Sequence, residues 1–386
     1  MQLKAVRWGP IQFRQLLGPT SGRIEPGAWV HVYGPDGLFA GQGWCNHRSE
    51  LAVRIVTREP VDSEAGFLQR QIDRAWNLRK SLTPPPAELP EACRLINSEG
   101  DGLSGLVVDR LGPVLSIEAH SLAAWRLADQ VARLLADRAG CPSACVHMDQ
   151  RIAEAEGLRE SPLRWIGPPR EQITLREGNI RIRVRFGKDL GQHKTGYFCD
   201  QRLQRVRFGQ LAAGHHVLDV CCYSGAFACH AAANHAASVT AVELDEHAVQ
   251  LARENANLNQ QRIAITHADA FPWMRQAHAN GRLFGRIVLD PPKLIHTREE
   301  TRIGTQKYID LNKLAFQLAE PDAILCTCSC SGLLHAHDFT RLVCDAARYV
   351  GRKIQLLELC GPPPDHPVMA DYPEGAYLKA LWLRVL

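Results

Sequence analysis

The sequence lacks any run of about 18 consecutive apolar residues, the length that a membrane-spanning helix needs. Its opening stretch, MQLKAVRWGP, also lacks the apolar segment of a secretory signal peptide. Internal repeats and low-complexity tracts are absent as well, and the composition is that of an ordinary globular protein. We therefore expect a cytoplasmic protein that does not associate with membranes.

An excess of one charge is missing too. The net charge of +4 comes from 45 basic and 41 acidic residues, which permits nucleic-acid binding without requiring it. The 13 cysteines lie in a large chain without an export signal, so most are expected to be reduced thiols. Cys141 and Cys145 have one residue too many between them for a CxxC zinc knuckle, and no clear second pair exists. No metal site is expected.

What is present suggests two or three domains, because the chain has 386 residues. Residues 1–75 contain short β-rich segments separated by glycine turns, which predict a small β-barrel. An amphipathic helix from Glu64 to Leu82 follows, and the proline-rich residues 83–90 end it. Residues 76–170 continue with two β-rich runs around the turn RLGP and then a helical pattern, which predicts a small α+β domain.

Residues 171–386 alternate between strands and helices. The strand candidates are HHVLDVCC, SVTAVELD, IAITHADA, RIVLD, AILCTCS and KIQLLELC, and a helical pattern follows each of the first five. This rhythm predicts an α/β fold with a parallel, doubly wound, Rossmann-like sheet that binds its ligand at the carboxyl ends of the strands. AYLKALWLRVL adds a seventh strand, which is compatible with an antiparallel return at the edge.

Small residues follow the first strand of this domain. Asp219 stands at its tip, and Ser224 and Gly225 enter the next helix, where small residues let the backbone approach a ligand closely. One glycine stands where a dinucleotide-binding fold has GxGxxG, so NAD binding is disfavoured. By itself this pattern is equally compatible with a structural turn.

The next two strands also end in acids. Glu243 can accept hydrogen bonds from a ribose diol, and Asp269 can accept from the exocyclic amine of adenine. A solvated or helix-capping carboxylate is the alternative for Glu243. Acids at three successive strand ends form one constellation, which chance produces less readily than any single motif.

The fourth strand leads into DPPKL. Two prolines hold the backbone extended after Asp290, whose carboxylate could accept from the N4 amine of a cytosine. Enzymes that methylate amino groups usually carry an aromatic residue after the two prolines, where this chain has Lys293. The lysine argues against an adenine or guanine amino group as the target.

The fifth strand carries Cys326, Cys328 and Cys330 at alternating positions, which share one face of an extended strand. Carbon C5 of a pyrimidine is a poor nucleophile until a group adds at C6, and a thiolate with a lowered pKa can do so. We expect Cys326 to be a buried structural thiol. Cys330, at the strand's end, is the favoured nucleophile, and Cys328 is the second candidate.

A polar loop, KDLGQHKTGYFCDQR, precedes the first strand of the domain. It contains Gly191, Lys194 and Gly196, and its basic and aromatic groups could hold a carboxylate or a phosphate. A solvated turn is the alternative reading of this loop.

Several long motifs, in order, resemble those of the bacterial 23S ribosomal RNA cytosine-C5 methyltransferases with an N-terminal PUA domain, the large-subunit methyltransferase I family. They are EGDGLSGLVVDR, HKTGYFCDQR, LDVCCYSGAF, DPPKL, SCSGLL and DHPVMADYPEGAYLK. The resemblance runs from about Arg94 to Leu386, and the first seventy residues match the family less well.

This resemblance implies a PUA-like barrel, a small α+β domain and a seven-stranded class I methyltransferase domain that uses S-adenosylmethionine. It implies that Cys330 is the nucleophile and that 23S rRNA is the substrate. The implied cofactor contacts are Gln201, Asp219, Glu243, Asp269 and Asp290. Uridine-C5 methylation and a non-catalytic RNA-binding role remain the alternatives, and a homodimer is one option for the oligomeric state.

Overall fold

The computed structural model describes residues 1–83, 86–160, 163–187 and 197–386. Their contacts divide the chain into two compact units. The first comprises residues 1–175, 184–199 and 364–375, and the second comprises residues 176–183, 200–363 and 376–386. Among the described residues, no helix has the length and apolar character needed to cross a bilayer.

The first unit begins with a four-stranded antiparallel sheet in the order β1-β4-β3-β2. Its strands are β1 (Ile11–Gln12), β2 (Ala28–Tyr33), β3 (Phe39–Cys45) and β4 (Val53–Thr57). Alternate residues such as Val30, Val32 and Ile55 fill a small core on one face. The β-rich segments predicted for this region are therefore present as strands.

Helix α1 (Glu64–Ser81) follows the sheet. Ser63 begins it as an N-cap, because its side-chain oxygen accepts a hydrogen bond from the backbone N–H of Gly66. Phe67 and Ile72 are buried against the core of the unit. This confirms the predicted amphipathic helix to within one residue.

A five-stranded sheet in the order β5-β6-β7-β8-β9 completes the first unit. The elements are β5 (Ala92–Asn97), β6 (Leu106–Leu111), β7 (Val114–Ala119), α2 (Leu122–Ala139), β8 (Ser143–His147), α3 (Gln150–Ala155) and β9 (Leu163–Ile166). Only β7 and β8 pair in parallel, since α2 connects them. The predicted small α+β arrangement is present.

The hairpin of β10 (Gln172–Glu177) and β11 (Ile180–Arg185) precedes the second unit's seven-stranded sheet. That sheet has the order β14-β13-β12-β15-β16-β18-β17. Its strands are β12 (His216–Val220), β13 (Ser238–Glu243), β14 (Ala264–His267), β15 (Phe284–Leu289), β16 (Ala319–Ser329), β17 (Ile354–Cys360) and β18 (Lys379–Val385). The first five run parallel, as predicted.

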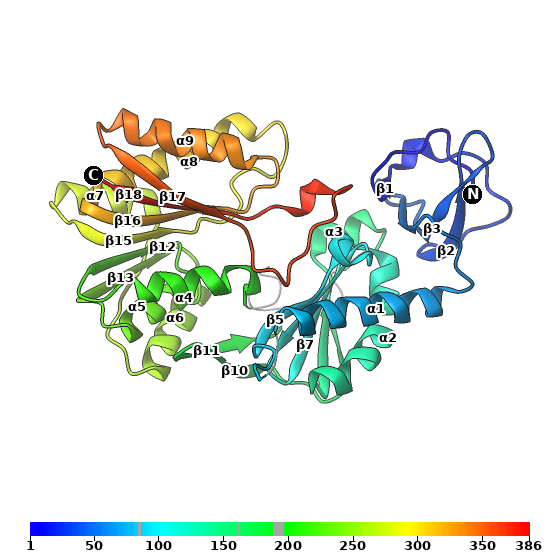
Figure 1. Ribbon diagram of the computed structural model, residues 1–386, viewed down its shortest axis with the longest axis horizontal. Helices are drawn as coiled ribbons and strands as arrows, with labels where there is room; N and C mark the ends of the chain where they lie inside the picture. Colours follow the sequence, from blue (N-terminus) through cyan, green and yellow to red (C-terminus); the bar gives the residue numbers. More distant parts are fainter. Residues whose placement is uncertain (84–85, 161–162, 188–196) are drawn as a thin grey trace. The chain divides into compact units, whose positions relative to one another are not determined.

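Helices cover both faces of this sheet, as Figure 1 shows. The helices are α4 (Arg202–Gln210), α5 (Ala226–Ala233), α6 (Glu246–Leu258), α7 (Ala270–Ala279), α8 (Thr301–Gln317) and α9 (Ala336–Tyr349). Helices α7, α8 and α9 pack on one face around Leu218 and Val220. Phe208 of α4 and Phe227 of α5 pack on the other face, around Val217. The predicted α/β doubly wound fold is confirmed.

The last strand departs from the expected place. β18 is antiparallel to both β16 and β17 and lies between them, so β17 is the edge strand. Trp382 and Leu383 of β18 are fully buried on opposite faces of the sheet, which an edge position would not achieve as completely. The apolar run LWL is therefore better explained by an interior strand.

Candidate functional site

The five parallel strands of the second unit end at one edge of the sheet, and the loop after β12 lies there. Cys221, Tyr223 and Gly225 in this loop have φ values of 61°, 48° and 74°. At Gly225, a Cβ atom would lie 3.1 Å from Cβ of Ala252 on α6, so a side chain would press the two helices apart. The strained turn keeps the backbone before α5 compact and close to the strand ends.

Glu243, the last residue of β13, holds this loop. Its Oε2 accepts a hydrogen bond of 2.7 Å from the backbone N–H of Tyr223. Its Oε1 accepts from the N–H groups of Leu244 and Asp245 at 2.8 and 3.0 Å. Because each carboxylate oxygen has about two acceptor positions, Oε2 keeps one for an incoming hydroxyl group. The capping role falls to Asp245, which accepts from the N–H of Ala248 at the start of α6.

Asp219 is fully buried, on the same face of the sheet as Val217. Its Oδ2 accepts from the backbone N–H of Ala228 at 3.0 Å, which fastens α5 to β12. Its Oδ1 is buried and has no hydrogen-bond partner among the described residues. Burial raises the pKa of Asp219 to about 8, and the charges of Asp290 and Glu243 also raise it.

Asp269 is exposed at the carboxyl end of β14 and begins α7 as its N-cap, where Oδ1 accepts from the N–H of Phe271 at 2.8 Å. One acid at the strand ends, Asp269, thus serves as a helix cap.

Ser224 is buried, and its carbonyl oxygen accepts a hydrogen bond from the Asn255 side chain at 2.9 Å. Lys194, Gly191 and Gly196 lie outside the described residues.

Asp290 follows β15 directly, at the same edge, and is partly exposed. Its backbone N–H donates to Val220, which ties the start of DPPK to the end of β12. Burial raises the pKa of the Asp290 carboxyl group to about 7, and the charge of Asp200 adds to this effect. The amide of Gln201 and the guanidinium of Arg205 act in the opposite direction.

Gln201, at the start of α4, is buried with no hydrogen-bond partner for either amide atom among the described residues. Its neighbour Asp200 accepts at Oδ2 from the Tyr377 hydroxyl group at 2.6 Å, while Asp200 Oδ1 is buried without a described partner. Unpaired buried polar atoms are costly, so a cluster of them indicates a place that a bound molecule or water completes.

The three cysteines of the fifth strand differ in their surroundings. Cys326 and Cys328 are fully buried, with their sulfur atoms 3.9 Å apart, in the core that faces α4 and α5. Hydrogen bonding to Cys326 and burial raise the pKa of Cys328 well above its usual value. Cys330 lies one residue beyond β16 and is partly exposed. Cys330 is therefore the accessible thiol of the three.

Two serines hold the backbone on either side of Cys330. Ser329 and Ser331 each lie 3.0 Å, oxygen to oxygen, from the hydroxyl group of Tyr308 on α8. The Ser331 hydroxyl also accepts from the backbone N–H of Ile295 at 3.3 Å. These contacts fix the turn that carries the thiol.

Lys379, the first residue of β18, lies directly opposite Ser329 in the sheet. Its side chain is buried, and Nζ donates to the carbonyl oxygens of Ser331 and Tyr377, both at 2.7 Å. Sequence reasoning assigned no role to Lys379, Tyr308 or Asp200. The motif DYPEGAYLK already contained Lys379, but the spacing along the chain gave no signal for Tyr308.

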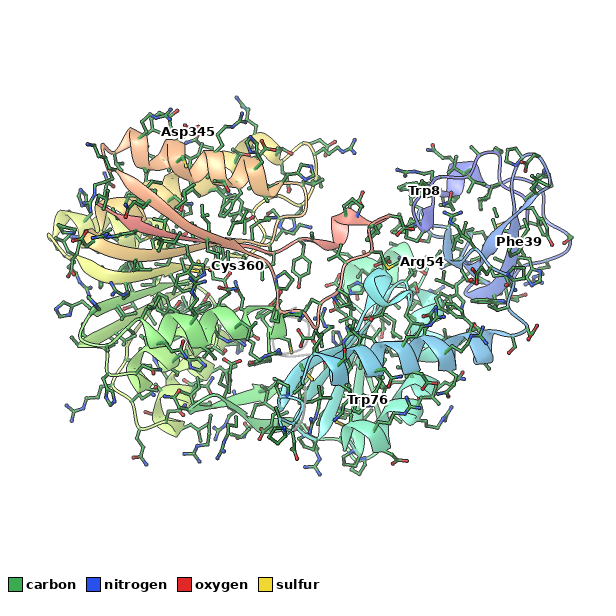
Figure 2. All side chains as sticks on the ribbon, viewed as in Figure 1. Trp8, Phe39, Arg54, Trp76, Asp345 and Cys360 are labelled. Carbon is green, nitrogen blue, oxygen red and sulfur yellow. The ribbon has the colours of Figure 1, made fainter. Side chains whose placement is uncertain are left out.

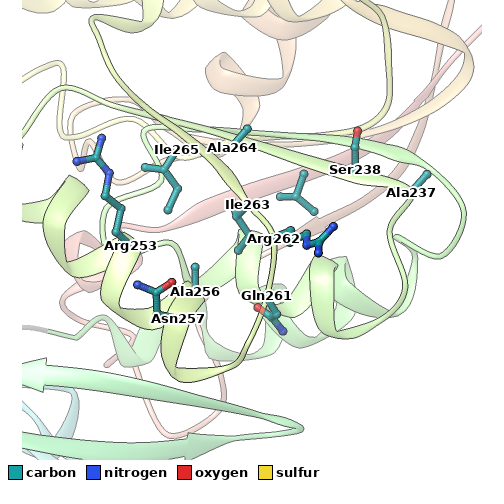
Figure 3. Close-up of a pocket in the computed structure, with 11 residues that line it drawn as sticks. Ala237, Ser238, Arg253, Ala256, Asn257, Gln261, Arg262, Ile263, Ala264 and Ile265 are labelled. Atoms are coloured by element: carbon teal, nitrogen blue, oxygen red, sulfur yellow. The ribbon is translucent and has the colours of Figure 1, made fainter.

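A hollow also lies between α6 and strands β13 and β14, as Figure 3 shows. It is lined by Ser238 and Ala264, the first residues of β13 and β14, and by Arg253 and Asn257 of α6. It is thus at the amino ends of the strands. Glu243, Asp269, Asp290 and Cys330 lie at the opposite, carboxyl ends of their strands.

The strand order, the antiparallel β18 and the acids after successive strands define a class I methyltransferase fold. Comparison with known proteins agrees. Residues 9–58 match the PUA-like domain family, and residues 165–279 match the ribosomal protein L11 methyltransferase family. The second match stops before Asp290 and Cys330, so it covers the first three strands of the sheet and leaves out the strands that carry these two residues.

Relatives called ribosomal RNA large subunit methyltransferase I match almost the whole chain. The protein from Pseudoalteromonas atlantica is 33% identical over 99% of this chain and 96% of its own length. The protein from Shewanella frigidimarina is 34% identical over 95% of this chain and 92% of its own length. The chain belongs to the ribosomal RNA large subunit methyltransferase I family.

Solved structures agree on the fold. A candidate SAM-dependent methyltransferase from Streptococcus mutans is 18% identical, with a TM-score of 0.82 and coverage of 100% of both chains. A candidate methyltransferase complexed with SAH is also 18% identical, with a TM-score of 0.81 and coverage of 97% of this chain and 95% of that one.

Proposed function

We propose that this protein is a cytoplasmic, S-adenosylmethionine-dependent methyltransferase that forms 5-methylcytosine in 23S ribosomal RNA. One observation carries the proposal: Cys330 is accessible at the end of β16, beside the end of β15 that leads into Asp290, while Cys328 is buried. The names of the family's members support RNA as the substrate. Methylation at a pyrimidine C5 requires a nucleophile that adds at C6, and an accessible thiol can serve as one.

S-adenosylmethionine would supply an electrophilic methyl group. We assign its ribose diol to the remaining acceptor position of Glu243 Oε2, and its adenine amine to Asp269. The unpaired amide of Gln201 and the buried Oδ1 of Asp219 are further polar atoms that a bound cofactor or its waters would satisfy. Lys194, Ser224 and Gly225 complete the proposed cofactor contacts. The SAH complex of a protein with the same fold supports this choice of ligand.

In the proposed reaction the sulfur of Cys330 attacks C6 of a cytosine that has left the base stack. A C–S bond forms as the C5–C6 π bond opens, so C5 becomes nucleophilic. C5 would then take the methyl group, whose bond to the sulfonium sulfur breaks and leaves S-adenosylhomocysteine. Loss of the C5 proton to water or a buffer base then re-forms the C5–C6 double bond and expels the thiolate. The contacts of the Ser329 and Ser331 hydroxyl groups with Tyr308 would keep the turn that carries the sulfur in place throughout.

Asp290 is suited to recognise cytosine at this position. With a pKa of about 7, its carboxyl group carries a proton in a substantial part of the molecules at neutral pH. The protonated form can donate to N3 of cytosine, and the ionised form can accept from the N4 amine. Donation to N3 would draw electron density from C6 and assist the attack of Cys330.

We propose a division into an RNA-binding domain at residues 1–75, a central α+β domain at 76–170 and the methyltransferase domain at 171–386.

Trp8, which Figure 2 labels, lies on the loop before β1. It is 79% exposed, and the guanidinium group of Arg58 lies 5.7 Å from its ring centroid. An exposed aromatic ring beside a cation suits the stacking of an unpaired base. This surface supports an RNA-binding role for the first domain.

The test is to incubate the purified protein with labelled S-adenosylmethionine and with 23S rRNA from cells that lack it, and then to identify the modified nucleoside by mass spectrometry. Labelled 5-methylcytidine is expected, and Cys330→Ala should abolish it. Labelled 5-methyluridine would transfer the assignment to uridine. No transfer to any RNA, by a protein that binds the cofactor, would favour the non-catalytic alternative.

A further inference from the structure

Lys379 carries a buried charge that lacks a carboxylate partner. Lys379 is 4% exposed, and among the described residues its ammonium group contacts two carbonyl oxygens and no carboxylate. Two of its three N–H donors are used by the carbonyl oxygens of Ser331 and Tyr377. A buried ammonium group is costly unless an anion lies close to it. The third donor and the charge therefore require a partner that these two contacts do not supply.

The contacts of Lys379 place its ammonium group beside the turn that carries Cys330, and the charge of Cys330 acts on it. Ser331, whose carbonyl binds the ammonium group, is the residue directly after Cys330, and Ser329 on its other side faces Lys379 across the strands. We propose that Lys379 holds Cys330 as a thiolate before RNA binds, and is thus a positioning residue that activates the nucleophile. The inference rests on the proposed function, in which Cys330 attacks C6.

The other charged and titratable groups near the pair support the assignment. Burial lowers the pKa of Lys379 to about 8, the charge of Cys330 raises it, and the charge of the exposed Lys293 lowers it. The hydroxyl group of Tyr308, on α8, contacts Ser329 and Ser331 on either side of Cys330, and burial raises the pKa of Tyr308, as does the charge of Cys330. Lys379 thus senses the charge of Cys330, and its ammonium form predominates up to about pH 8.

The activation step is a simple proton balance. The S–H bond of Cys330 breaks and the proton leaves to water, while Lys379 keeps all three of its protons. The ammonium group stabilises the resulting thiolate by charge, as cations do at reactive cysteines. When the final elimination expels the sulfur from C6, the same charge stabilises the leaving thiolate. Lys379 therefore assists both bond formation and bond cleavage without exchanging a proton.

The experiment measures the thiolate directly, without RNA. The full-length protein is treated with iodoacetamide at pH 5.5 to 9.5, and alkylation of the peptide that contains Cys330 is followed by mass spectrometry. In the unchanged protein we expect a reactive thiolate well below pH 8. The pH at which the alkylation rate reaches half of its maximum is the alkylation midpoint. In Lys379→Met this midpoint should rise by at least about one pH unit, which means about tenfold slower alkylation at pH 7. Lys379→Arg should restore most of the reactivity.

Lys353→Met is the matched control, because it removes an exposed lysine of the same unit just before β17. Its alkylation midpoint should not change. Binding of S-adenosylhomocysteine, measured by calorimetry, reports whether each variant is folded. If Lys379→Met does not fold, Lys379→Gln and Lys379→Arg provide the comparison, and only the charged variant should keep the low midpoint.

Two results would overturn the inference: an unchanged midpoint in a folded variant without the charge, or no reactive thiolate below pH 8 in the unchanged protein. Failure of the proposed function would look different. In that case Cys330→Ala would still methylate RNA, whatever Lys379 does to the alkylation midpoint. The two ideas can therefore fail separately.

Discussion

Replacing Glu243 by alanine tests the proposed cofactor site most sharply, because the structure defines what is lost. The change removes the acceptor of three backbone N–H groups, at Tyr223, Leu244 and Asp245. Leu244 is exposed and Asp245 is partly exposed, so water can replace Glu243 for these two. The N–H of Tyr223 lies in the strained loop after β12, where an unpaired donor costs ~1–3 kcal/mol.

The effect on binding adds a second contribution. A ribose hydroxyl group that loses a charged acceptor loses ~1.5–3 kcal/mol, which corresponds to about 10- to 150-fold in affinity. Loosening of the Tyr223 loop can only increase this loss. We therefore expect Glu243→Ala to weaken S-adenosylhomocysteine binding by at least about tenfold. Glu243→Gln keeps one acceptor oxygen, so its affinity for S-adenosylhomocysteine should lie between those of the unchanged protein and Glu243→Ala.

Isothermal titration calorimetry with S-adenosylhomocysteine measures the dissociation constants. Glu246→Ala is the matched control, because Glu246 is an exposed acid three residues further along, in the first turn of α6. It should bind within about twofold of the unchanged protein. If Glu243→Ala also bound within twofold, Glu243 would hold only the loop, and the ribose would have to be assigned elsewhere.

Three further predictions concern the chemistry, the pH dependence and the RNA. With RNA that carries 5-fluorocytidine at the target, a covalent complex should form, survive in Cys328→Ala and disappear in Cys330→Ala; the opposite pattern on a denaturing gel would reverse the assignment. The raised pKa of Asp219 means that the folded protein holds a proton that the unfolded chain releases above about pH 4. The free energy of unfolding should therefore fall as pH rises from about 4 to 8, by at most about 1.4 kcal/mol per pH unit, and urea titrations should give a flatter dependence for Asp219→Asn. Trp8→Ala should weaken RNA binding by ~1–3 kcal/mol, and deletion of residues 1–75 should flatten its salt dependence while cofactor binding persists; an unchanged salt slope would assign RNA contact to other parts of the chain.

The sheet was predictable because strand periodicity and alternation with helices are local properties of the sequence. The place of β18 was not, since LWL is apolar in either an edge or an interior strand. The pairing of β18 with both β16 and β17 is what distinguishes an interior strand from an edge strand here. Strand pairing of this kind joins residues that are far apart in the chain, such as Cys360 with Ala380 and Ser329 with Lys379, and no short window of sequence contains it.

The sequence also could not predict the surroundings of the individual acids at the strand ends. Their location at one edge of the sheet followed from counting strands, but the direction of each side chain did not. Asp219 shares a face with Val217 and is therefore buried under α5, whereas Glu243 and Asp269 remain partly or fully exposed. A carboxylate at a strand end can fasten a helix, hold a loop or cap a helix, and here Asp219, Glu243 and Asp269 do so in that order.

The antiparallel direction of β18 explains how Lys379 comes to the catalytic edge. A parallel strand presents its carboxyl end there, so that Asp290 follows β15 and Cys330 follows β16 at this edge. An antiparallel neighbour presents its first residue instead, and Lys379 is the first residue of β18. Because β18 lies inside the sheet, its first side chain is buried against the end of β16 and cannot extend into water. The same insertion that sequence periodicity did not predict thus places a desolvated cation beside the turn that carries Cys330, the proposed nucleophile.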